Sequence, residues 1–311
     1  MAKTMFGNFD FMALRKPAMI LSCLLLLVSV GSLITLKLNL GIDFTGGSII
    51  EVGYEQPVEL QPVREALERA GFADAIVQHF GSANEVLIRL VPDPEKEKAE
   101  LSSQVIRVLQ DLGESGGVDV RRVDFVGPQV GEELTEDGGL AVLYALIAIL
   151  IYVAFRFEYR FSLGAIAALV HDVVITLGIF SVFQLDFDLS VLAAVLAVIG
   201  YSLNDTIVVF DRIRENFRKI RKHSTIDIVN TSVNQTISRT LITSLTTLLV
   251  LLSLFFLGGE VIHAFALALI IGVVVGTYSS IYVATTSALL LGISRVDLLL
   301  PAKEDEETAR P

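Results

Sequence analysis

The chain has 311 residues, of which 53% are apolar, and its mean hydropathy is +0.64. Several unbroken apolar runs, each about as long as the 20 residues that cross a bilayer, exclude a water-soluble enzyme. The net charge of −11 excludes nucleic acid as an expected partner, because its phosphates require a basic surface. The single cysteine, Cys23, excludes an intrachain disulfide and a cysteine-rich metal site.

Six apolar runs predict six transmembrane helices. The first run follows Arg15 and Lys16, as the apolar part of a signal peptide does, but it is too long for one and no small-residue cleavage site precedes Lys37. We therefore expect it to remain as a membrane anchor. The predicted spans are residues 18–36, 138–155, 162–183, 189–210, 239–256 and 261–291.

The distribution of Lys and Arg predicts the orientation of these spans, because basic residues are retained on the cytoplasmic side of short loops. The N-terminus (1–17), the tail (292–311) and the connections after the second and fourth spans all contain basic residues. The alternate short loops, 184–188 and 257–260, contain none. Both termini are therefore predicted to be cytoplasmic, and residues 37–137 to lie on the opposite, periplasmic side.

The outer segment 37–137 holds the whole net charge of the chain. It carries 9 basic and 20 acidic residues, whereas the rest of the chain carries 15 of each. Such acidity keeps a small domain soluble beside anionic lipid, and it also favours contact with basic or unfolded clients. Of the two explanations, solubility is the simpler.

Apolar alternation in this outer segment predicts four strands, and apolar helical spacing predicts two helices. Their order is β-α-β-β-α-β, which is the order of the ferredoxin-like fold, and that fold indicates no function by itself. The predicted strands are residues 47–53, 75–80, 85–91 and 118–126, and the predicted helices are 58–70 and 94–112. The fold class is therefore a polytopic α-helical membrane protein of six transmembrane helices, with a small α+β ferredoxin-like (βαββαβ) domain between helices 1 and 2.

Two glycine-rich segments, 41–47 (GIDFTGG) and 126–131 (VGPQVG), connect the outer domain to its flanking spans. Glycine permits backbone angles that other residues avoid, and such segments are typical both of hinges and of ordinary tight turns. Composition does not separate these two interpretations. The candidate hinge residues are Gly41, Asp43, Gly46 and Gly47 in the first segment and Gly127, Pro128 and Gly131 in the second.

Asp205 is the most informative ionisable residue of the chain. It lies six residues inside the cytoplasmic end of the fourth predicted span, a depth of roughly 9 Å at the helical rise. Burying an ionisable group there costs at least about 2.5–3.5 kcal/mol. Asp205, with its polar neighbour Asn204, is therefore a candidate for proton transport, and the alternative is a carboxyl group hydrogen-bonded for packing.

Arg239 lies at the mouth of the fifth predicted span, and polar residues continue inward from it. Because arginine does not release its proton, we expect it to act as an electrostatic partner of Asp205 or as a gate. His171 and Asp172 lie near the middle of the third span. They are either a proton relay or a neutral hydrogen-bonded pair that locks helices together.

The basic segment 211–223 follows the fourth span. Phe210, Ile213 and Phe217 recur at helical spacing along it, beneath a basic face. This pattern predicts an amphipathic helix on the anionic lipid of the inner leaflet, with docking of a partner as the alternative.

Four blocks of the sequence, 41–47, 126–131, 200–216 and 234–244, together resemble the signature blocks of the SecF family, in the family's order. These proteins belong to the resistance-nodulation-division (RND) type of transporter and work in bacterial Sec secretion. The resemblance implies a bacterial inner-membrane protein that assembles with SecD, contacts the SecYEG channel and often YajC, and acts on unfolded preproteins. It also implies that Asp205 and Arg239 belong to a proton path driven by the proton-motive force.

The resemblance further implies a transport subunit rather than an enzyme, with protons as the coupling ion and no other cofactor or metal. The absence of a GxxxxGK[ST] loop agrees with the lack of a nucleotide site. The alternative function is a structural subunit that transports nothing and only positions SecD or the channel. A small-molecule exporter is a poorer match, because the outer segment is too short for two domains.

Overall fold

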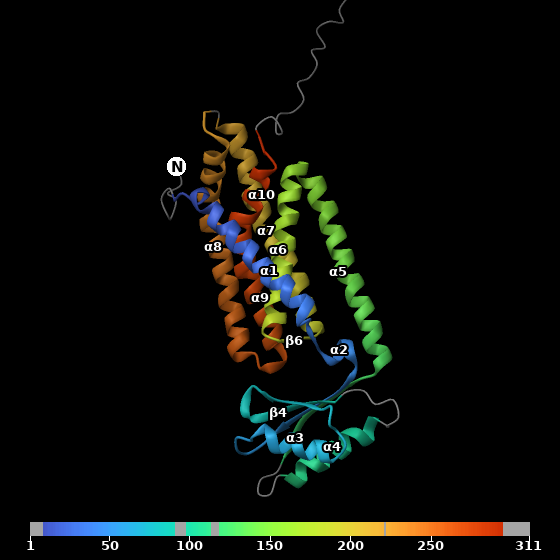
Figure 1. The fold of residues 1–311 in the computed structure, drawn as a ribbon. Helices are drawn as coiled ribbons and strands as arrows, with labels where there is room; N and C mark the ends of the chain where they lie inside the picture. The colour runs from blue at the N-terminus through green and yellow to red at the C-terminus, as the bar shows by residue number, and fades with distance from the viewer. Residues whose placement is uncertain (1–8, 91–97, 113–117, 221, 295–311) are drawn as a thin grey trace, which may run out of the picture.

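The structure is a computed structural model, and it describes residues 9–90, 98–112, 118–220 and 222–294. Within these ranges, six helical segments are long and apolar enough to cross a membrane, as predicted. Figure 1 shows them as one bundle with a smaller α/β unit at one end. The helices are α1 (Arg15–Thr35, after the short η1, Met12–Leu14), α5 (Pro128–Arg156), α6 (Tyr159–Val182), α7 (Leu189–Lys219), α8 (Thr225–Leu257) and α9 (Glu260–Ser279), which continues through the π-helical turn η2 (Ser280–Ala284) into α10 (Thr285–Leu290).

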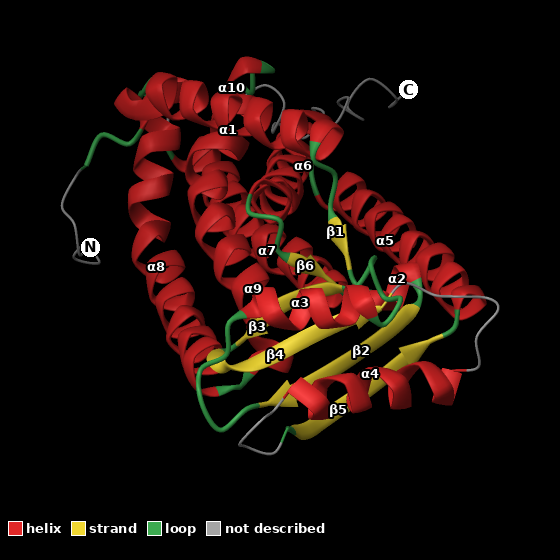
Figure 2. Cartoon of the chain, turned by 60° about the horizontal axis from the view of Figure 1, so that its bottom comes forward, coloured by secondary structure: helices red, strands yellow, loops and turns green. Residues whose placement is uncertain are grey.

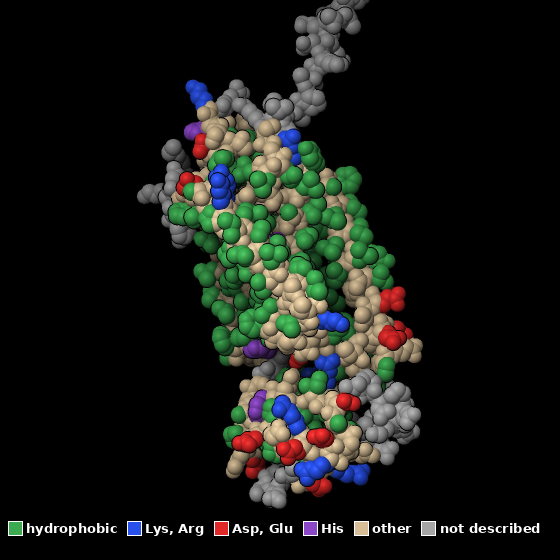
Figure 3. All heavy atoms as spheres, viewed as in Figure 1, with side chains coloured by type: hydrophobic (Ala, Val, Ile, Leu, Met, Phe, Trp, Pro, Cys, Tyr) green, Lys and Arg blue, Asp and Glu red, His purple; other side chains and the backbone are tan. Residues whose placement is uncertain are grey.

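Apolar side chains cover the flank of the bundle visible in Figure 3, and the charged side chains on that face gather towards its two ends. This distribution is the one that a bilayer requires. Among the six, α6 and α7 bury the largest share of their apolar windows, and α5 and α8 bury the smallest. The inner helices are therefore α6 and α7.

Several helices extend beyond the predicted spans, because local capping and helix-forming residues continue after the apolar run ends. α5 begins at Pro128, ten residues before the predicted span, with proline in its first turn, where its missing N–H costs nothing. α8 begins at Thr225, where Ser224 and Asp227 form a capping box. Hydropathy alone therefore marks where a helix meets lipid but not where it ends.

The prediction of an amphipathic helix on the lipid surface over 211–223 is wrong. Residues up to Lys219 continue α7 without a break. The side chains of Phe210, Ile213 and Phe217 are at most 1% exposed and pack in the bundle core with residues of α8 such as Val229. Hydrophobic periodicity identified the buried face correctly, but it is covered by protein rather than lipid.

The α/β unit has its elements in the order predicted from the sequence. Figure 2 shows α3 and α4 on one face of an antiparallel sheet whose strand order in the described residues is β3-β4-β2-β5. Alternate side chains such as Ile50, Val86 and Ile88 point towards the two helices and are fully buried. The elements are β2 (Gly47–Gly53), α3 (Leu60–Arg69), β3 (Ile76–Phe80), β4 (Ser82–Leu90), α4 (Lys98–Leu112) and β5 (Asp119–Val126).

Three short elements that the sequence did not predict attach this unit to the bundle. β1 (Asn39–Leu40) pairs in parallel with β6 (Asp186–Phe187), which belongs to the loop between α6 and α7. The third element is α2 (Ile42–Thr45), within the first glycine-rich segment. Pairing between segments about 147 residues apart in the chain attaches the α/β unit to one end of the bundle, which is the lower end in Figure 1.

Candidate functional site

Asp205 lies on the buried side of α7. Its side chain is 3% exposed, and its Oδ2 atom is buried without a hydrogen-bond partner in the described chain. Asn204, the preceding residue, is exposed on the outside of the bundle, because successive helical residues are turned about 100° apart. A buried carboxyl oxygen without a donor is costly, and the neutral acid costs less than the carboxylate. Asp205 is therefore suited to hold a proton in this conformation.

Arg239 does not pair with Asp205 in this structure. Its side chain is exposed, and no ion pair within 4.0 Å joins these two described residues. The residue that follows it, Thr240, is 1% exposed, and its hydroxyl has no hydrogen-bond partner in the described chain. The structure thus brings the helices α7 and α8 together but leaves the predicted cation and carboxyl apart.

Hydroxyl groups link α7, α8 and α9 near this level. The Tyr201 hydroxyl donates to Ser244 Oγ over 3.2 Å, and Ser244 Oγ lies 2.7 Å from Thr277 Oγ1. These contacts lie five residues after Arg239 along α8, whereas the hydroxyls of Thr240 and Thr243 make no hydrogen bond to another helix in the described chain.

His171 and Asp172 form a buried polar centre with two serines from other helices. His171 Nδ1 lies 2.8 Å from Asp172 Oδ1, and these residues are 2% and 1% exposed. Asp172 Oδ2 accepts hydrogen bonds from Ser202 Oγ of α7 and, over 2.6 Å, from Ser279 Oγ of α9. Asp172 therefore ties three helices together, as the helix-locking alternative requires.

One nitrogen of His171 remains available to a proton relay. His171 Nε2 is buried and has no hydrogen-bond partner in the described chain. If Nδ1 carries the hydrogen that faces Asp172, Nε2 is a free acceptor. Both interpretations of this pair therefore have structural support.

Glycines explain how closely α7 and α9 approach here. A Cβ atom on Gly272 would lie 2.0 Å from Val198 Cγ2, and one on Gly276 would lie 3.0 Å from Ser202 Cβ. Only the missing side chains leave room for α7 at these two successive turns of α9. This close contact allows the hydroxyls of Ser202 and Ser279 to reach one carboxyl group.

Sequence reasoning missed Ser279 and Thr277. The signal was present, because residues 277–280 (TYSS) form a polar run inside the sixth apolar span. The π-helical turn η2 follows at Ser280, and such turns occur frequently at functional sites.

The first glycine-rich segment is held by hydrogen bonds to the loop before α7. Gly41 N–H donates to Phe187 O over 2.8 Å, and Asp43 Oδ2 accepts from the N–H of Leu189, the first residue of α7, over 3.0 Å. Asp43 therefore caps a helix that is remote in sequence. Gly46 and Gly47 have φ angles of 69° and 122°, which other residues rarely adopt.

The second glycine-rich segment packs against the first. Gly127 precedes α5 as its N-cap residue, with Pro128 at the start of the helix. A Cβ atom on Gly131 would lie 2.9 Å from the backbone nitrogen of Gly46. The predicted joints are thus two sides of one junction, in contact with each other.

Family models match two parts of the chain. Residues 105–294 match the model described as "Protein export membrane protein SecD/SecF, C-terminal", and residues 31–58 match the "SecD/SecF GG Motif". The second match includes the glycine-rich segment 41–47.

Similar proteins cover nearly the full chain. The protein translocase subunit SecF of Vibrio alginolyticus is 54% identical over 96% of this chain and 95% of its own length. The corresponding SecF of Pseudomonas aeruginosa is 48% identical, over 98% of each chain, and that of Escherichia coli O157:H7 is 46% identical, over 97% and 94%.

Solved structures of related proteins are also similar to this chain. SecDF of Thermus thermophilus, described as a translocon-associated membrane protein, superposes with a TM-score of 0.83 at 39% identity over 94% of this chain. A SecDF structure in a super-membrane-facing form gives a TM-score of 0.67 at 40% identity, over 92% of this chain. This chain spans 39% of the length of either SecDF chain. The chain is a multi-pass membrane protein that belongs to the SecF family of protein translocase subunits, within the SecD/SecF protein-export membrane proteins.

Proposed function

We propose that this chain is an accessory subunit of Sec-dependent export that pairs with a SecD subunit in the bacterial inner membrane. Both termini are cytoplasmic, and the α/β unit is a ferredoxin-like domain on the periplasmic side. The complex contacts SecYEG and YajC, and it uses the proton-motive force to promote preprotein translocation and release. The names and lengths of the similar SecF proteins support the Sec role and the SecD partner.

The single observation that carries the proton-driven part is the state of Asp205. It is a buried carboxyl group on an inner helix, and its Oδ2 has no donor in the described chain. A group of this kind is retained in a membrane span despite its cost, which favours a functional role.

The mechanism follows from two states of this carboxyl group. Protonated, Asp205 remains buried and unpaired; ionised, it requires a cation, and Arg239 on the adjacent helix α8 is the candidate. A shift of α8 against α7 that brings Arg239 into contact with Asp205 would exchange one state for the other. Moving one charge across the membrane supplies about 2.3 kcal/mol per 100 mV, which is enough to bias such a shift.

Two further parts extend this proposal. Asn204, His171 and Asp172 are secondary members of the proton path, and Asp172 reaches α7 directly through Ser202. The glycine junction, in which Gly46 and Gly131 are in contact, transmits helix motion to the periplasmic domain.

The decisive experiment replaces Asp205 by asparagine, which keeps the shape but removes the titration. Asp205→Asn, assembled with SecD in membrane vesicles, is expected to lower proton-dependent export to the level observed without a proton gradient. Asp137→Asn is the matched control, because Asp137 is exposed on α5. Recovery of the SecD complex in normal yield shows that assembly is intact.

The alternative, a structural subunit that only positions SecD or the channel, predicts the opposite outcome. Unchanged proton-dependent export in Asp205→Asn and in Arg239→Ala would exclude the proton mechanism and favour that alternative.

A further inference from the structure

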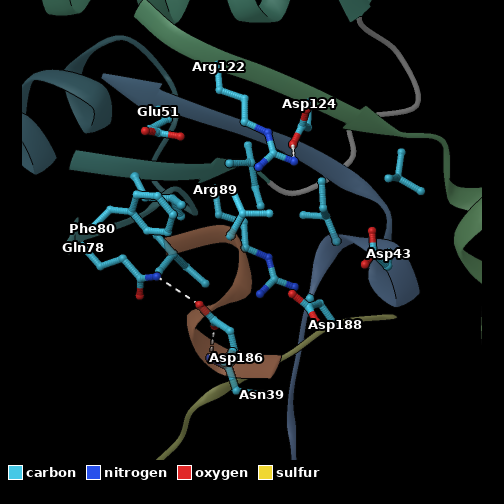
Figure 4. A pocket seen from close by; sticks show the side chains of 18 of the residues that line it. Asn39, Asp43, Glu51, Gln78, Phe80, Arg89, Arg122, Asp124, Asp186 and Asp188 are labelled. Atoms are coloured by element: carbon cyan, nitrogen blue, oxygen red, sulfur yellow. Dashed lines mark hydrogen bonds and ion pairs between the residues drawn. The ribbon is translucent and has the colours of Figure 1, made fainter. Parts of the chain in front are cut away.

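A cavity of about 440 Å³ separates the sheet of the α/β unit from the end of the bundle. Its volume lies in the range of small-ligand sites. Figure 4 shows side chains of the sheet directed into it from one side and those of the β1–β6 region from the other. The cavity thus lies where the extramembrane unit meets the outer ends of the helices.

The sheet side of the cavity is the face that α3 and α4 leave uncovered. The strand register places two cross-strand rows on it. In one row Glu51 of β2 lies between Leu87 of β4 and Arg122 of β5, and in the next Ile49 lies between Arg89 and Asp124. All six side chains line the cavity. The surface therefore combines apolar and charged groups in an ordered array.

The two guanidinium groups in these rows are already engaged. Arg89 donates to the carbonyl oxygen of Leu40 and to Thr45 Oγ1, and Arg122 forms a 2.5 Å ion pair with Asp124. Neither forms an ion pair within 4.0 Å with Glu51.

Glu51 is the carboxylate that remains. It makes no hydrogen bond and no ion pair within 4.0 Å with any described residue. Burial in the cavity wall raises its pKa, and the nearby Glu85 carboxylate adds to this effect, whereas the charges of Arg121 and Arg122 offset it only in part. The opposite wall adds Asp43, Asp186 and Asp188, so that the lining carries five carboxylates and two guanidiniums, and all of the carboxylates except Glu51 have hydrogen-bond or ion-pair partners. The cavity consequently attracts a cation.

The remaining lining is apolar and in part accessible. Ile76, at the edge strand β3, is 50% exposed, and Val261 at the start of the sixth span is 58% exposed. An inorganic cation would leave these groups against water. A ligand that carries both a positive charge and apolar groups satisfies both walls.

We propose that this cavity binds a short extended segment of the polypeptide being exported, in which a Lys or Arg side chain meets Glu51 and neighbouring apolar side chains cover Ile49, Leu87 and Ile76. The inference rests on the proposed export function, which brings unfolded chains to this side of the membrane. The negative charge of the cavity favours the basic residue, and the apolar side chains of its lining favour apolar residues beside it in the client.

The test is site-specific photocrosslinking in the full chain assembled with SecD in membrane vesicles. Ile76 is replaced by a benzophenone amino acid, and a secretory protein arrested in transit carries either Lys or Glu in the arrested segment. The Lys version is expected to crosslink about fivefold more than the Glu version, the effect of one partly screened ion pair. Glu51→Gln is expected to remove that difference.

Gln61, exposed on α3 away from the cavity, is the matched crosslinking position. Equal yields from Gln61 and Ile76, equal yields for Lys and Glu, or adducts to lipid or SecD in place of the client would each overturn the inference. Export is measured in the same vesicles. Normal proton-dependent export without a client adduct refutes the cavity alone, whereas insensitivity of export to Asp205→Asn refutes the proposed function alone.

Discussion

Two buried carboxyl groups on inner helices have contrasting surroundings in this protein. Asp172 accepts from serines of two other helices and lies beside His171, whereas Asp205 Oδ2 has no donor in the described chain. A buried polar group with all its hydrogen bonds stabilises a bundle. A buried carboxyl oxygen without a donor raises the free energy of the folded state, and protonation or a new partner lowers it again. This difference separates the group suited to holding helices from the group suited to changing state.

Ser279→Ala tests the holding role of Asp172. The substitution removes one of the hydrogen bonds to the carboxyl group and is expected to destabilise the bundle by about 1–2 kcal/mol. The measurement is the fraction of folded, detergent-solubilised chain that remains after heating. Ser253→Ala is the control, since Ser253 is exposed on α8 and bonds only to its own helix through Leu249 O. Equal losses of folded chain in the two variants would contradict the role of Asp172 in holding the helices together.

Glu51 gives a pH dependence of known sign. Burial raises its pKa in the folded chain, so between the unfolded and folded pKa values the folded state binds more protons. The contribution of Glu51 to stability therefore becomes less favourable as pH rises above 4.5, the ordinary pKa of a glutamate side chain. Glu51→Gln removes this loss. It is therefore expected to increase the protection of the β2 backbone amides against hydrogen exchange at neutral pH but not at low pH.

Hydrogen exchange of the β2 amides, corrected for the intrinsic effect of pH, measures this difference. Glu55→Gln, at an exposed position two residues after the end of β2, is the control. A larger gain in protection at low pH than at neutral pH would show that the sign is wrong.

At the scale of elements, the contact between α7 and α9 depends on missing side chains. Gly272→Ala would place a Cβ atom 2.0 Å from Val198 Cγ2 and 2.8 Å from Val198 Cβ, and valine has little freedom to turn away. Overpacking of this kind is expected to cost about 1–3 kcal/mol. Thermal unfolding of the chain in detergent, followed by circular dichroism, measures it.

Gly200→Ala is the matched control on α7. A Cβ atom there meets nothing within 4 Å, so the variant is expected to keep or raise stability through better helix propensity. If Gly272→Ala unfolds at the same temperature as Gly200→Ala, the stability of the bundle does not depend on the close approach of α9 to α7.

At the scale of the whole molecule, half-buried side chains of the sheet make polar contacts with the segments that attach it to the bundle. Arg89 donates to Leu40 and Thr45, and Gln78 Nε2 donates to Asp186 Oδ2 over 3.2 Å. Contacts of this kind, made by partly exposed side chains, suit a unit that moves relative to its support.

A crosslink across this contact tests the need for motion. Gln78→Cys with Asp186→Cys, in a Cys23→Ser background, is joined by a short bifunctional thiol reagent. The crosslinked chain is expected to lose most proton-dependent export, and a cleavable reagent is expected to restore it on reduction. Export that continues while the crosslink is intact would show that the unit works without moving from this position.

Much of the architecture follows from patterns local to the chain. Hydropathy located all six spans, and apolar alternation located the strands of the α/β unit, with β2 at its observed bounds. Asp205 was identified because a carboxyl group in a long apolar run is costly wherever the helix packs. The ends of α5, α7 and α8 were missed because capping and intrahelical hydrogen bonds continue a helix after its apolar run has ended.

The sequence by itself determined how many helices meet the lipid, the order of elements outside it, and which carboxyl group is out of place. Only the tertiary structure decided that Arg239 is exposed and makes no ion pair with Asp205, that Ser202 and Ser279 converge on Asp172, and that both glycine segments form one junction. The cavity around Glu51 was likewise invisible, because its walls come from β-strands, the β6 loop and α9. Hydrophobic periodicity is a property of neighbouring residues, whereas the rotation of one helix against another depends on side-chain packing between segments distant in the chain.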